Sequence, residues 1–369
     1  MFVDIYAIQN VPPSNINRDD TGSPKTAYYG GSLRARVSSQ AWKKAMRDSF
    51  RKVLPVEKLG VRTKLVPGEV AERICQKDPE LKDASEELAV SVLKVIGIKT
   101  QSSTRAGSQQ GNDETGYLVF ISERELDKLA DLAVQWAHDG ADWEKPDAEM
   151  KKAAKNIFHG TQAIDIALFG RMLADAPDLN VDAASQVAHA ISVDTVRQEA
   201  DYFTALDDLA NDDNAGAAMI DSTGFNASTL YRYANVNVDS LAEQIKDREA
   251  VADAVVAFVE AFVRSMPSGK QNSFANHTLP EAVVVSLRKE QPINMVSAFE
   301  KPVRADADHS VSQNAVELLT KKIEEVETEY DARAKQSWSI GTETGTTLEK
   351  LKQDLHNAVL DSLKAGQEA

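Results

Sequence analysis

The succession of strand-like and helix-like segments constrains the fold of this chain more than any other sequence feature. Residues 2–8 and 231–238 alternate between apolar and polar side chains, which is typical of half-buried strands. The other predicted strands are residues 33–37, 164–169, 188–193 and 282–287. Helices are predicted from Ser38 or Ser39 to about Val53, and around residues 251–262 and 313–333. This order predicts an α+β fold in which an antiparallel sheet is backed by two helices.

A helical insertion is predicted to separate the first strands from the rest of the sheet. Between about residues 54 and 156 the composition changes to helical segments and loops, and Ser122–Glu125 has the pattern of a capping box that opens a helix. Residues 99–116 contain almost no apolar side chains. With 369 residues, of which 42% are hydrophobic, the chain is long enough to form two or three lobes.

The composition argues against membrane and secreted classes of protein. No apolar run approaches the roughly 20 residues that a membrane-spanning helix requires. The first six residues include Asp4 and lack a basic segment, so they do not resemble a signal peptide. Cys75 is the one cysteine in the sequence and has no partner for an internal disulfide, which fits a reducing compartment. We therefore expect a cytoplasmic protein without a membrane partner.

Positive charge is concentrated in one stretch of an otherwise acidic chain. Between Ile16 and Lys52 there are nine Lys and Arg residues against three acidic residues, whereas the whole chain has a formal net charge of −15. A local excess of cations on an acidic body is typical of a polyanion site. Within this stretch, residues 33–37 are predicted to be a strand that carries Arg34 and Arg36 on an exposed basic face.

The start of the helix after this strand is the most distinctive local candidate for a binding site. A helix N-terminus offers free backbone N–H groups and the positive end of the helix dipole, and Ser38, Ser39 and Gln40 add polar side chains. Lys43 and Arg47 are four residues apart, so they share one face of the helix. A capped surface helix with solvated lysines would show the same local pattern. The additional cations at Arg18, Lys25, Arg34 and Arg36 favour a phosphate site.

A second candidate is residues 267–273, where Ser268 and Gly269 precede Lys270 and Gln271. Small residues let backbone amides approach a ligand, and the two longer side chains supply donors. The segment lacks the first glycine of a P-loop and the Ser or Thr that follows its lysine. A glycine at the end of a helix explains the same residues without any ligand.

A third candidate lies in the polar region from Asp194 to Gly224, in which Tyr202, Phe203 and Leu206 are embedded. Exposed aromatic side chains beside a basic groove can stack on bases or wedge between them. The same side chains could instead fold back onto the sheet. A smaller basic face at Lys151, Lys152 and Lys155 is more typical of a solvated surface.

Arrangements that could carry catalysis are sparse. The six histidines are scattered and have no metal-ligand spacing. Asp19 and Asp20 could bind a cation, although an acidic pair beside Arg18 is more typical of a salt-bridged loop. We therefore expect no catalytic residue, no metal and no cofactor.

A series of sequence blocks runs in order along most of the chain. The first two blocks are Asn17-Arg-Asp-Asp20 and the run from Arg34 to Arg47. The blocks that follow in order are residues 165–172, 188–191, 202–209, 231–235, 269–271 and 298–301. Together these blocks resemble the CasC family, the crRNA-binding backbone subunits of the type I-E CRISPR Cascade complex. The likeness is weakest in the helical insertion and after about Ser337.

The resemblance implies a hand-shaped subunit with a modified RNA-recognition-motif, or ferredoxin-like, palm. The implied palm is residues 1–53, 157–193 and 225–369, the helical finger insertion is residues 54–156, and the β-hairpin thumb is residues 194–224. The implied partners are crRNA, target DNA paired with the crRNA, further copies of the chain in a head-to-tail filament, and other Cascade subunits. The implied function is non-catalytic presentation of the crRNA spacer.

The resemblance also assigns the RNA contacts. The crRNA backbone would be held by Arg18, Lys25, Ser38, Gln40, Lys43 and Arg47, with Lys270 and Gln271 completing the groove. The displaced base would be packed by Arg171, Met172, Phe203 and Leu206. The full set of predicted RNA-binding residues is Asn17, Arg18, Lys25, Arg34, Arg36, Ser38, Ser39, Gln40, Lys43, Lys44, Arg47, Arg171, Met172, Tyr202, Phe203, Leu206, Ser268, Gly269, Lys270 and Gln271.

Two other functions are compatible with the residues. Related subunits of type III complexes cleave target RNA with a palm aspartate, so a metal-dependent ribonuclease using Asp19 or Asp20 is one alternative. An enzyme that binds a nucleotide or phosphometabolite at the Ser38 helix cap is the other. The spread of basic residues over a strand, a loop and a helix favours RNA, because one small ligand needs fewer contacts.

Overall fold

The computed structural model describes residues 1–102, 113–205 and 219–368 of the chain. The chain divides into two compact units. Unit 1 contains Met1–Phe50, Gln186–Val238 and Val255–Ala369. Unit 2 contains Arg51–Ser185 and Asp239–Ala254.

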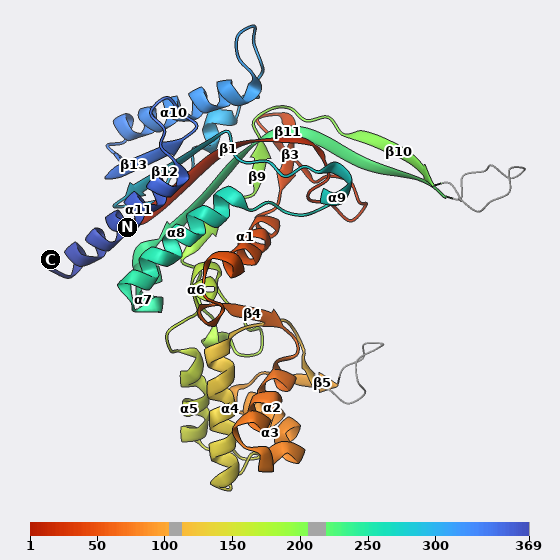
Figure 1. Cartoon of the computed structure of the whole chain (residues 1–369), viewed down its shortest axis with the longest axis vertical. Helices are drawn as coiled ribbons and strands as arrows, with labels where there is room; N and C mark the ends of the chain where they lie inside the picture. Colours follow the sequence, from red (N-terminus) through yellow and green to blue (C-terminus); the bar gives the residue numbers. More distant parts are fainter. Residues whose placement is uncertain (103–112, 206–218, 369) are drawn as a thin grey trace, which may run out of the picture. The chain divides into compact units, whose positions relative to one another are not determined.

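Unit 1 is built on a mainly antiparallel sheet (Figure 1). Its strands are β1 (Phe2–Ser14), β2 (Thr26–Tyr29), β3 (Ser32–Val37), β8 (Ser185–Val187), β9 (Ala190–Ser192), β10 (Glu199–Ala205), β11 (Met219–Asn237), β12 (Ala282–Arg288) and β13 (Gln336–Ile340). In the described residues the order is β13-β12-β1-β11-β9-β3-β2, while β8 and β10 also pair with β11. The strands predicted at residues 2–8, 231–238 and 282–287 are thus confirmed.

The two faces of this sheet have different cores. Tyr6 and Ile8 of β1 pack with Tyr233 of β11 on the face that α10 covers, and the rings of Tyr6 and Tyr233 are stacked with centroids 5.4 Å apart. Side chains alternate along a strand, so Ile5 and Ala7 face the other side of the sheet, where they are fully buried. β1 is therefore buried on both faces, whereas the alternation in the sequence predicted a strand buried on one face.

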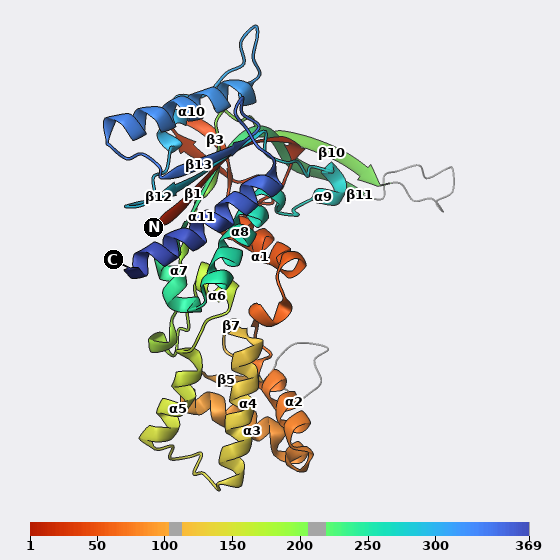
Figure 2. The same cartoon turned by 60° about the vertical axis from the view of Figure 1, so that its left-hand side comes forward.

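Helices cover both faces of the sheet in unit 1 (Figures 1 and 2). They are α1 (Ser39–Val53), α8 (Arg248–Arg264), α9 (Gln271–Phe274), η5 (Val296–Phe299), α10 (Val311–Glu329) and α11 (Leu348–Glu368). α1 buries Trp42, Met46 and Phe50, which recur every four residues along one face. α11 is tied to α8 by an ion pair of 2.7 Å between Lys352 and Glu260.

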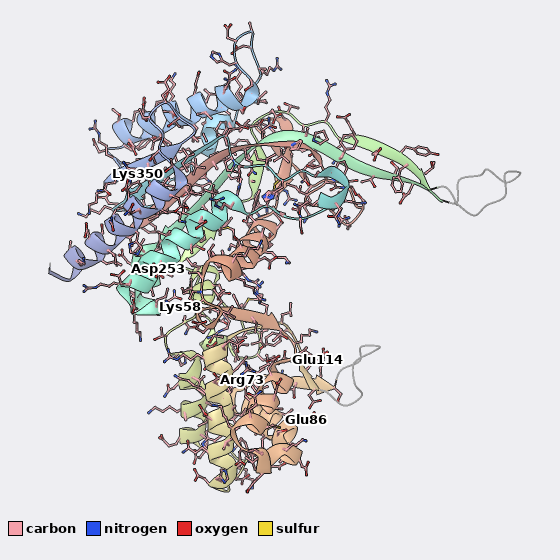
Figure 3. The ribbon with its side chains drawn as sticks, in the orientation of Figure 1. Lys58, Arg73, Glu86, Glu114, Asp253 and Lys350 are labelled. Carbon is pink, nitrogen blue, oxygen red and sulfur yellow. The ribbon has the colours of Figure 1, made fainter. Side chains whose placement is uncertain are left out.

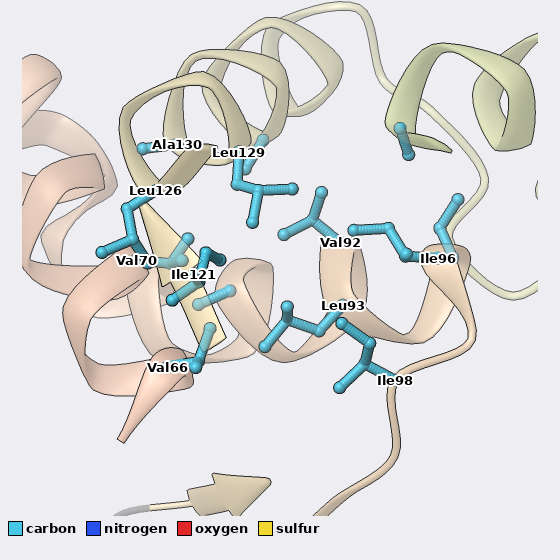
Figure 4. Packing of buried hydrophobic residues seen from close by; sticks show 14 of the residues in the cluster. Val66, Val70, Val92, Leu93, Ile96, Ile98, Ile121, Leu126, Leu129 and Ala130 are labelled. Carbon is cyan, nitrogen blue, oxygen red and sulfur yellow. The ribbon is translucent and has the colours of Figure 1, made fainter. Parts of the chain in front are cut away.

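Unit 2 is mostly helical in its described residues. Its elements are η1 (Val56–Lys58), β4 (Gly60–Thr63), α2 (Val66–Lys77), η2 (Pro79–Ala84), α3 (Ser85–Ile96), β5 (Thr100–Ser102), β6 (Asp113–Thr115), β7 (Val119–Ser122), α4 (Glu123–His138), α5 (Ala148–Phe158), α6 (Ile164–Phe169), η3 (Pro177–Leu179) and α7 (Val238–Ile245). Its core contains Val70, Val92, Leu93, Leu126 and Leu129, which interdigitate between α2, α3 and α4 (Figure 4).

Capping and ion pairs fix the helices of unit 2. The predicted capping box is present, because Ser122 accepts from the N–H of Glu125 and the Glu125 side chain accepts from the N–H of Ser122. Arg73 of α2 forms ion pairs with Glu69, Glu123 and Asp127, and Figure 3 labels its position among these helices.

One predicted strand is wrong. Residues 164–169 form the short helix α6, which ends at Gly170 with a φ of 78°. Ile164, Asp165, Ile166, Ala167 and Leu168 are all buried, and the Asp165 carboxylate accepts a hydrogen bond of 2.7 Å from the backbone N–H of Gly60. A short apolar run of this kind does not distinguish a buried strand from a buried helix.

The α+β class with an antiparallel sheet is confirmed. In the described residues, no helix combines the length and apolar character needed to cross a membrane.

Candidate nucleic-acid interface

The loop between β1 and β2 is closed by its own hydrogen bonds. The backbone N–H of Lys25 donates to the carbonyl of Asn17 over 2.9 Å, and Arg18 forms a bridge with Pro24. At the tip, Asp19 accepts from the N–H groups of Thr21 and Ser23, and the Thr21 hydroxyl holds the pKa of this exposed carboxyl below its usual value. The loop therefore holds Arg18, which is exposed, in a defined backbone geometry.

Asn17 joins this loop to the start of α1. Its Oδ1 accepts a hydrogen bond of 2.8 Å from the backbone N–H of Ser38, a residue that is 6% exposed. Ser38 in turn accepts from the N–H of Ala41 through its carbonyl, at 3.1 Å. The helix begins at Ser39, as predicted, and its first turn contains no acidic residue.

The basic residues of α1 have different surroundings. Lys44 is exposed and forms an ion pair of 2.6 Å with Asp48, so part of its charge is neutralised. Lys43 and Arg47 are partly exposed, and each makes an interaction within the protein. Gln40, in the first turn, is exposed. Lys43 and Arg47 lie one helical turn apart, which suits contacts to neighbouring phosphates.

The structure brings residues 268–271 against the loop that carries Asn17. A Cβ atom added to Gly269 would lie 2.5 Å from the carbonyl oxygen of Ile16, so only glycine permits this approach. Lys270 adopts a φ of 51°, and Gln271 begins the short helix α9. The two segments are far apart in sequence, and their proximity is a property of the fold.

Lys25 and Arg36 line a small pocket of unit 1 together with Asn17. The Arg36 Nε donates to the carbonyl of Thr26 over 3.1 Å, and its Nη1 lies 3.2 Å from Nδ1 of His189. These contacts hold the guanidinium beside the loop. The predicted residues at 17, 25, 36 and 38 are thus gathered in one region.

Arg34 corrects the prediction of an exposed basic face on β3. Its guanidinium is fully buried and donates to the carbonyls of Ser192, Val193, Phe299 and Glu300 at 2.7–3.1 Å. Desolvation lowers its pKa. All four acceptors are neutral, so the side chain ties together three chain segments and presents no charge to a ligand.

β10 and β11 form an antiparallel hairpin that extends from the sheet (Figure 1). Tyr202 is opposite Ser222 and is 65% exposed, whereas Phe203 is opposite Asp221 and is 37% exposed. Successive side chains of a strand point to opposite faces, so the two rings lie on opposite faces of the hairpin. Leu206 lies outside the described residues.

Arg171 and Met172 belong to unit 2, where they follow helix α6 and not the strand predicted at residues 164–169. Arg171 is 3% exposed and forms an ion pair of 2.7 Å with Glu125, while its guanidinium lies 4.8 Å from the ring centroid of Phe158. This side chain is committed to the core of unit 2. Met172 is 79% exposed and available for contact.

Sequence reasoning missed the residues that hold the loop in place. The Asn15 side chain is buried and its Nδ2 donates to the carbonyls of Gly22 and Gly224, at 2.9 and 2.8 Å. Gln198 donates to the carbonyl of Pro24 over 2.9 Å. Both residues join the loop to the base of the hairpin. No sequence pattern marks them, because their partners are distant in the chain.

The described residues contain no group of three His, Cys, Asp or Glu side chains that could hold a metal ion. In unit 2, the predicted basic face includes an ion pair of 2.7 Å between Lys155 and Asp178. The arrangement that remains in unit 1 is a set of cations, a helix start and backbone amides. Cations beside a helix N-terminus are groups that suit contact with phosphates.

Comparison with known proteins gives matches along the whole chain. Residues 3–366 match a family described as CT1975-like protein. A chain of the solved structure titled "CRISPR RNA-guided surveillance complex, pre-nicking" is 32% identical, with a TM-score of 0.82 over 97% of this chain and 100% of that chain. A chain of a "CRISPR RNA-guided surveillance complex" is 29% identical, with a TM-score of 0.71 over 98% and 100% of the two chains. No curated protein matches.

These matches define the class of this protein as CRISPR-associated. The chain belongs to the CT1975-like family, which contains the CasC-like backbone subunits of Cascade, and the resemblance inferred from the sequence blocks is confirmed.

Proposed function

We propose that this protein is a non-catalytic backbone subunit of a type I-E CRISPR surveillance complex, acting in the cytoplasm. It binds the phosphates of crRNA without reading the sequence, assembles head-to-tail on the RNA with copies of itself and other Cascade subunits, and presents the spacer for pairing with target DNA. The full-length matches to chains of RNA-guided surveillance complexes support this assignment.

The observation that carries the proposal is the convergence of three separate segments in unit 1. Asn17 bonds to the start of α1, and Gly269 packs against Ile16. Phosphate groups would thus meet Arg18 and Lys25 from the loop, the N-terminus of α1, and the residues after Gly269. Contacts of this type fix the register of an RNA without sequence preference, as a subunit that accepts every spacer requires.

The strand order supports an RNA-recognition-motif-like palm. β12, β1, β11 and β9 are neighbours in the sheet, α1 lies between β1 and β9 in the chain, and α8 lies between β11 and β12. This is the β-α-β-β-α-β order of a ferredoxin-like fold. We propose the domain bounds that the resemblance implies: the palm is residues 1–53, 157–193 and 225–369, the finger is residues 54–156, and the thumb is residues 194–224.

The test is RNA binding by the purified full-length protein at two salt concentrations. The double variant Lys43→Ala/Arg47→Ala should bind crRNA and random RNA more weakly than the wild type. Each lost phosphate contact on a single strand should reduce the slope of log K against log salt by about 0.7, so the slope should fall by about 1.4. Lys350→Ala/Lys364→Ala, on α11, is the charge-matched control.

The same samples test assembly and catalysis. The number of subunits bound should increase in proportion to RNA length, and the RNA should remain intact on a denaturing gel with Mg²⁺. If the Lys43→Ala/Arg47→Ala variant bound RNA as tightly as the wild type, α1 would not be part of the RNA site. If the wild type cleaved RNA in the presence of a metal ion and Asp19→Ala or Asp20→Ala did not, the protein would instead be a metal-dependent ribonuclease.

A further inference from the structure

Three basic side chains converge beside the loop, and one of them was not predicted as a site residue. His189 immediately precedes β9 and is exposed. Its Nδ1 lies 3.2 Å from Nη1 of Arg36. The backbone N–H of Arg36 donates to the carbonyl of Lys25 over 2.9 Å, which fixes these two residues next to each other.

These three side chains have no acidic partner among the described residues. Other arginines are neutralised there, for example Arg171 by Glu125 and Arg288 by Asp4, at 2.7 and 3.0 Å. The chain has 57 acidic and 42 basic residues, so a cluster without a carboxylate is unexpected by composition alone. A concentration of unneutralised positive charge at an exposed surface is a site for an anion.

The hydrogen bond to Arg36 defines the protonation state of His189. A guanidinium only donates, so Nδ1 must accept, and the ring in this arrangement is neutral. Desolvation and the charges of Arg36 and Lys25 lower the pKa of His189 below 6.5. On the neighbouring strand β11, the ionisable groups point elsewhere: Tyr231 bonds to Asn294, Tyr233 bonds to Asp4, and Arg232 lies over the ring of Trp42.

We propose that His189 forms part of a phosphate site with Lys25 and Arg36, and that it takes up one proton from solvent when an RNA phosphate binds. The inference rests on the proposed RNA-binding function and adds a residue and a proton to it. Protonation of Nδ1 removes the acceptor of the Arg36 Nη1 group, which then donates to a phosphate oxygen. The imidazolium supplies a further N–H donor to the same anion.

The direction of the pH dependence follows from linkage. A bound phosphate places negative charge beside His189 and raises its pKa relative to the free protein, where the two cations lower it. The complex therefore binds more protons than the free protein between these two pKa values. RNA affinity should rise as pH falls through the pKa in the complex, and should level off below the pKa of the free protein.

The experiment measures the affinity of the full-length protein for a short single-stranded RNA between about pH 7.5 and about pH 5.5, in a buffer free of phosphate. A pKa difference of one unit corresponds to a change in affinity of about tenfold. Wild-type affinity should rise by about this factor as the pH falls, whereas the affinity of His189→Ala should stay nearly constant. His309→Gln, which alters a histidine beside Asp306, should retain the wild-type rise.

Direct titration of the His189 ring by NMR, with and without RNA, gives an independent readout. The ring should titrate at higher pH in the complex than in the free protein. An equal pH dependence for wild type and His189→Ala, or an unchanged ring titration, would overturn the inference while leaving RNA binding intact. Failure of the wild type to bind RNA at every pH would instead overturn the proposed function, and this inference with it. A parallel series with single-stranded DNA of the same sequence separates a general phosphate site from one specific to RNA.

Discussion

The Oδ1 atom of Asn17 accepts a hydrogen bond of 2.8 Å from the backbone N–H of Ser38, and this contact couples the basic loop to the first turn of α1. Ser38 is nearly inaccessible to solvent, so its N–H has no water to replace this partner. The Asn17 side-chain amide therefore helps to set the spacing between this loop and the start of α1, together with the hydrogen bond of 2.9 Å from the Arg36 N–H to the Lys25 carbonyl.

Replacement of Asn17 by Ala should lower both stability and RNA affinity. The loss leaves the buried Ser38 N–H without an acceptor, which costs about 1–2 kcal/mol of the free energy of unfolding. Asn17→Asp keeps an acceptor and should unfold at nearly the wild-type temperature, yet it should bind RNA more weakly because it adds negative charge beside the phosphates. Thermal unfolding and RNA titration of both variants test this. Equal RNA affinity of Asn17→Asp and wild type would contradict it.

Arg34 and Arg36 should respond in opposite ways to the same substitution. Arg34→Met removes the donor to four carbonyl oxygens, three of them in buried hydrogen bonds, and should cost about 3 kcal/mol or more of stability. Arg36→Met should change stability by only about 0.5 kcal/mol and lower RNA affinity by about tenfold. Denaturant unfolding and RNA binding separate the two effects. If Arg34→Met kept the stability of the wild type and lost only RNA binding, the prediction that Arg34 stabilises the fold would be wrong.

Gly269→Ala should separate the segment around Lys270 from the loop. The added Cβ atom would lie 2.5 Å from the Ile16 carbonyl oxygen, a distance that requires the backbone to move. We expect a lower unfolding temperature and weaker RNA binding. Gly68→Ala is the matched control, because no atom lies within 4 Å of its added Cβ and Gly68 sits inside helix α2. That control should raise stability by about 0.5–1 kcal/mol and leave RNA affinity unchanged.

The exposed rings of the hairpin should contribute to RNA binding and not to stability. Phe203→Ala and Tyr202→Ala each remove a surface that can stack on a base, and a stacked base contributes about 1–3 kcal/mol. RNA affinity should therefore fall about tenfold for at least one of the two, with an unchanged unfolding temperature. Thr204→Ala on the same strand is the control. A loss of stability similar to that of a core substitution would show that the rings pack on the protein.

The sequence by itself predicted the elements that are determined by interactions between residues close together in the chain. Strand alternation in residues 2–8, the start of α1 after Ser38 and the capping box at Ser122 depend on neighbours within a few positions, and all three are present. The α+β class followed from their order. Family membership also followed, because the motif blocks are stretches of contiguous residues.

Tertiary structure decided which charged side chains remain available. Arg34 and Arg36 are two residues apart on β3 and look alike in sequence. Arg34 is buried and donates to the carbonyl of Phe299, a residue 265 positions away, while Arg36 remains beside Lys25 and His189. Arg171 is likewise neutralised by Glu125, 46 positions distant. The sequence also left the state of residues 164–169 open to the tertiary structure, because a short buried run is compatible with a strand or a helix. Burial of a charge requires acceptors supplied by distant segments, so periodicity and local composition carry no information about it.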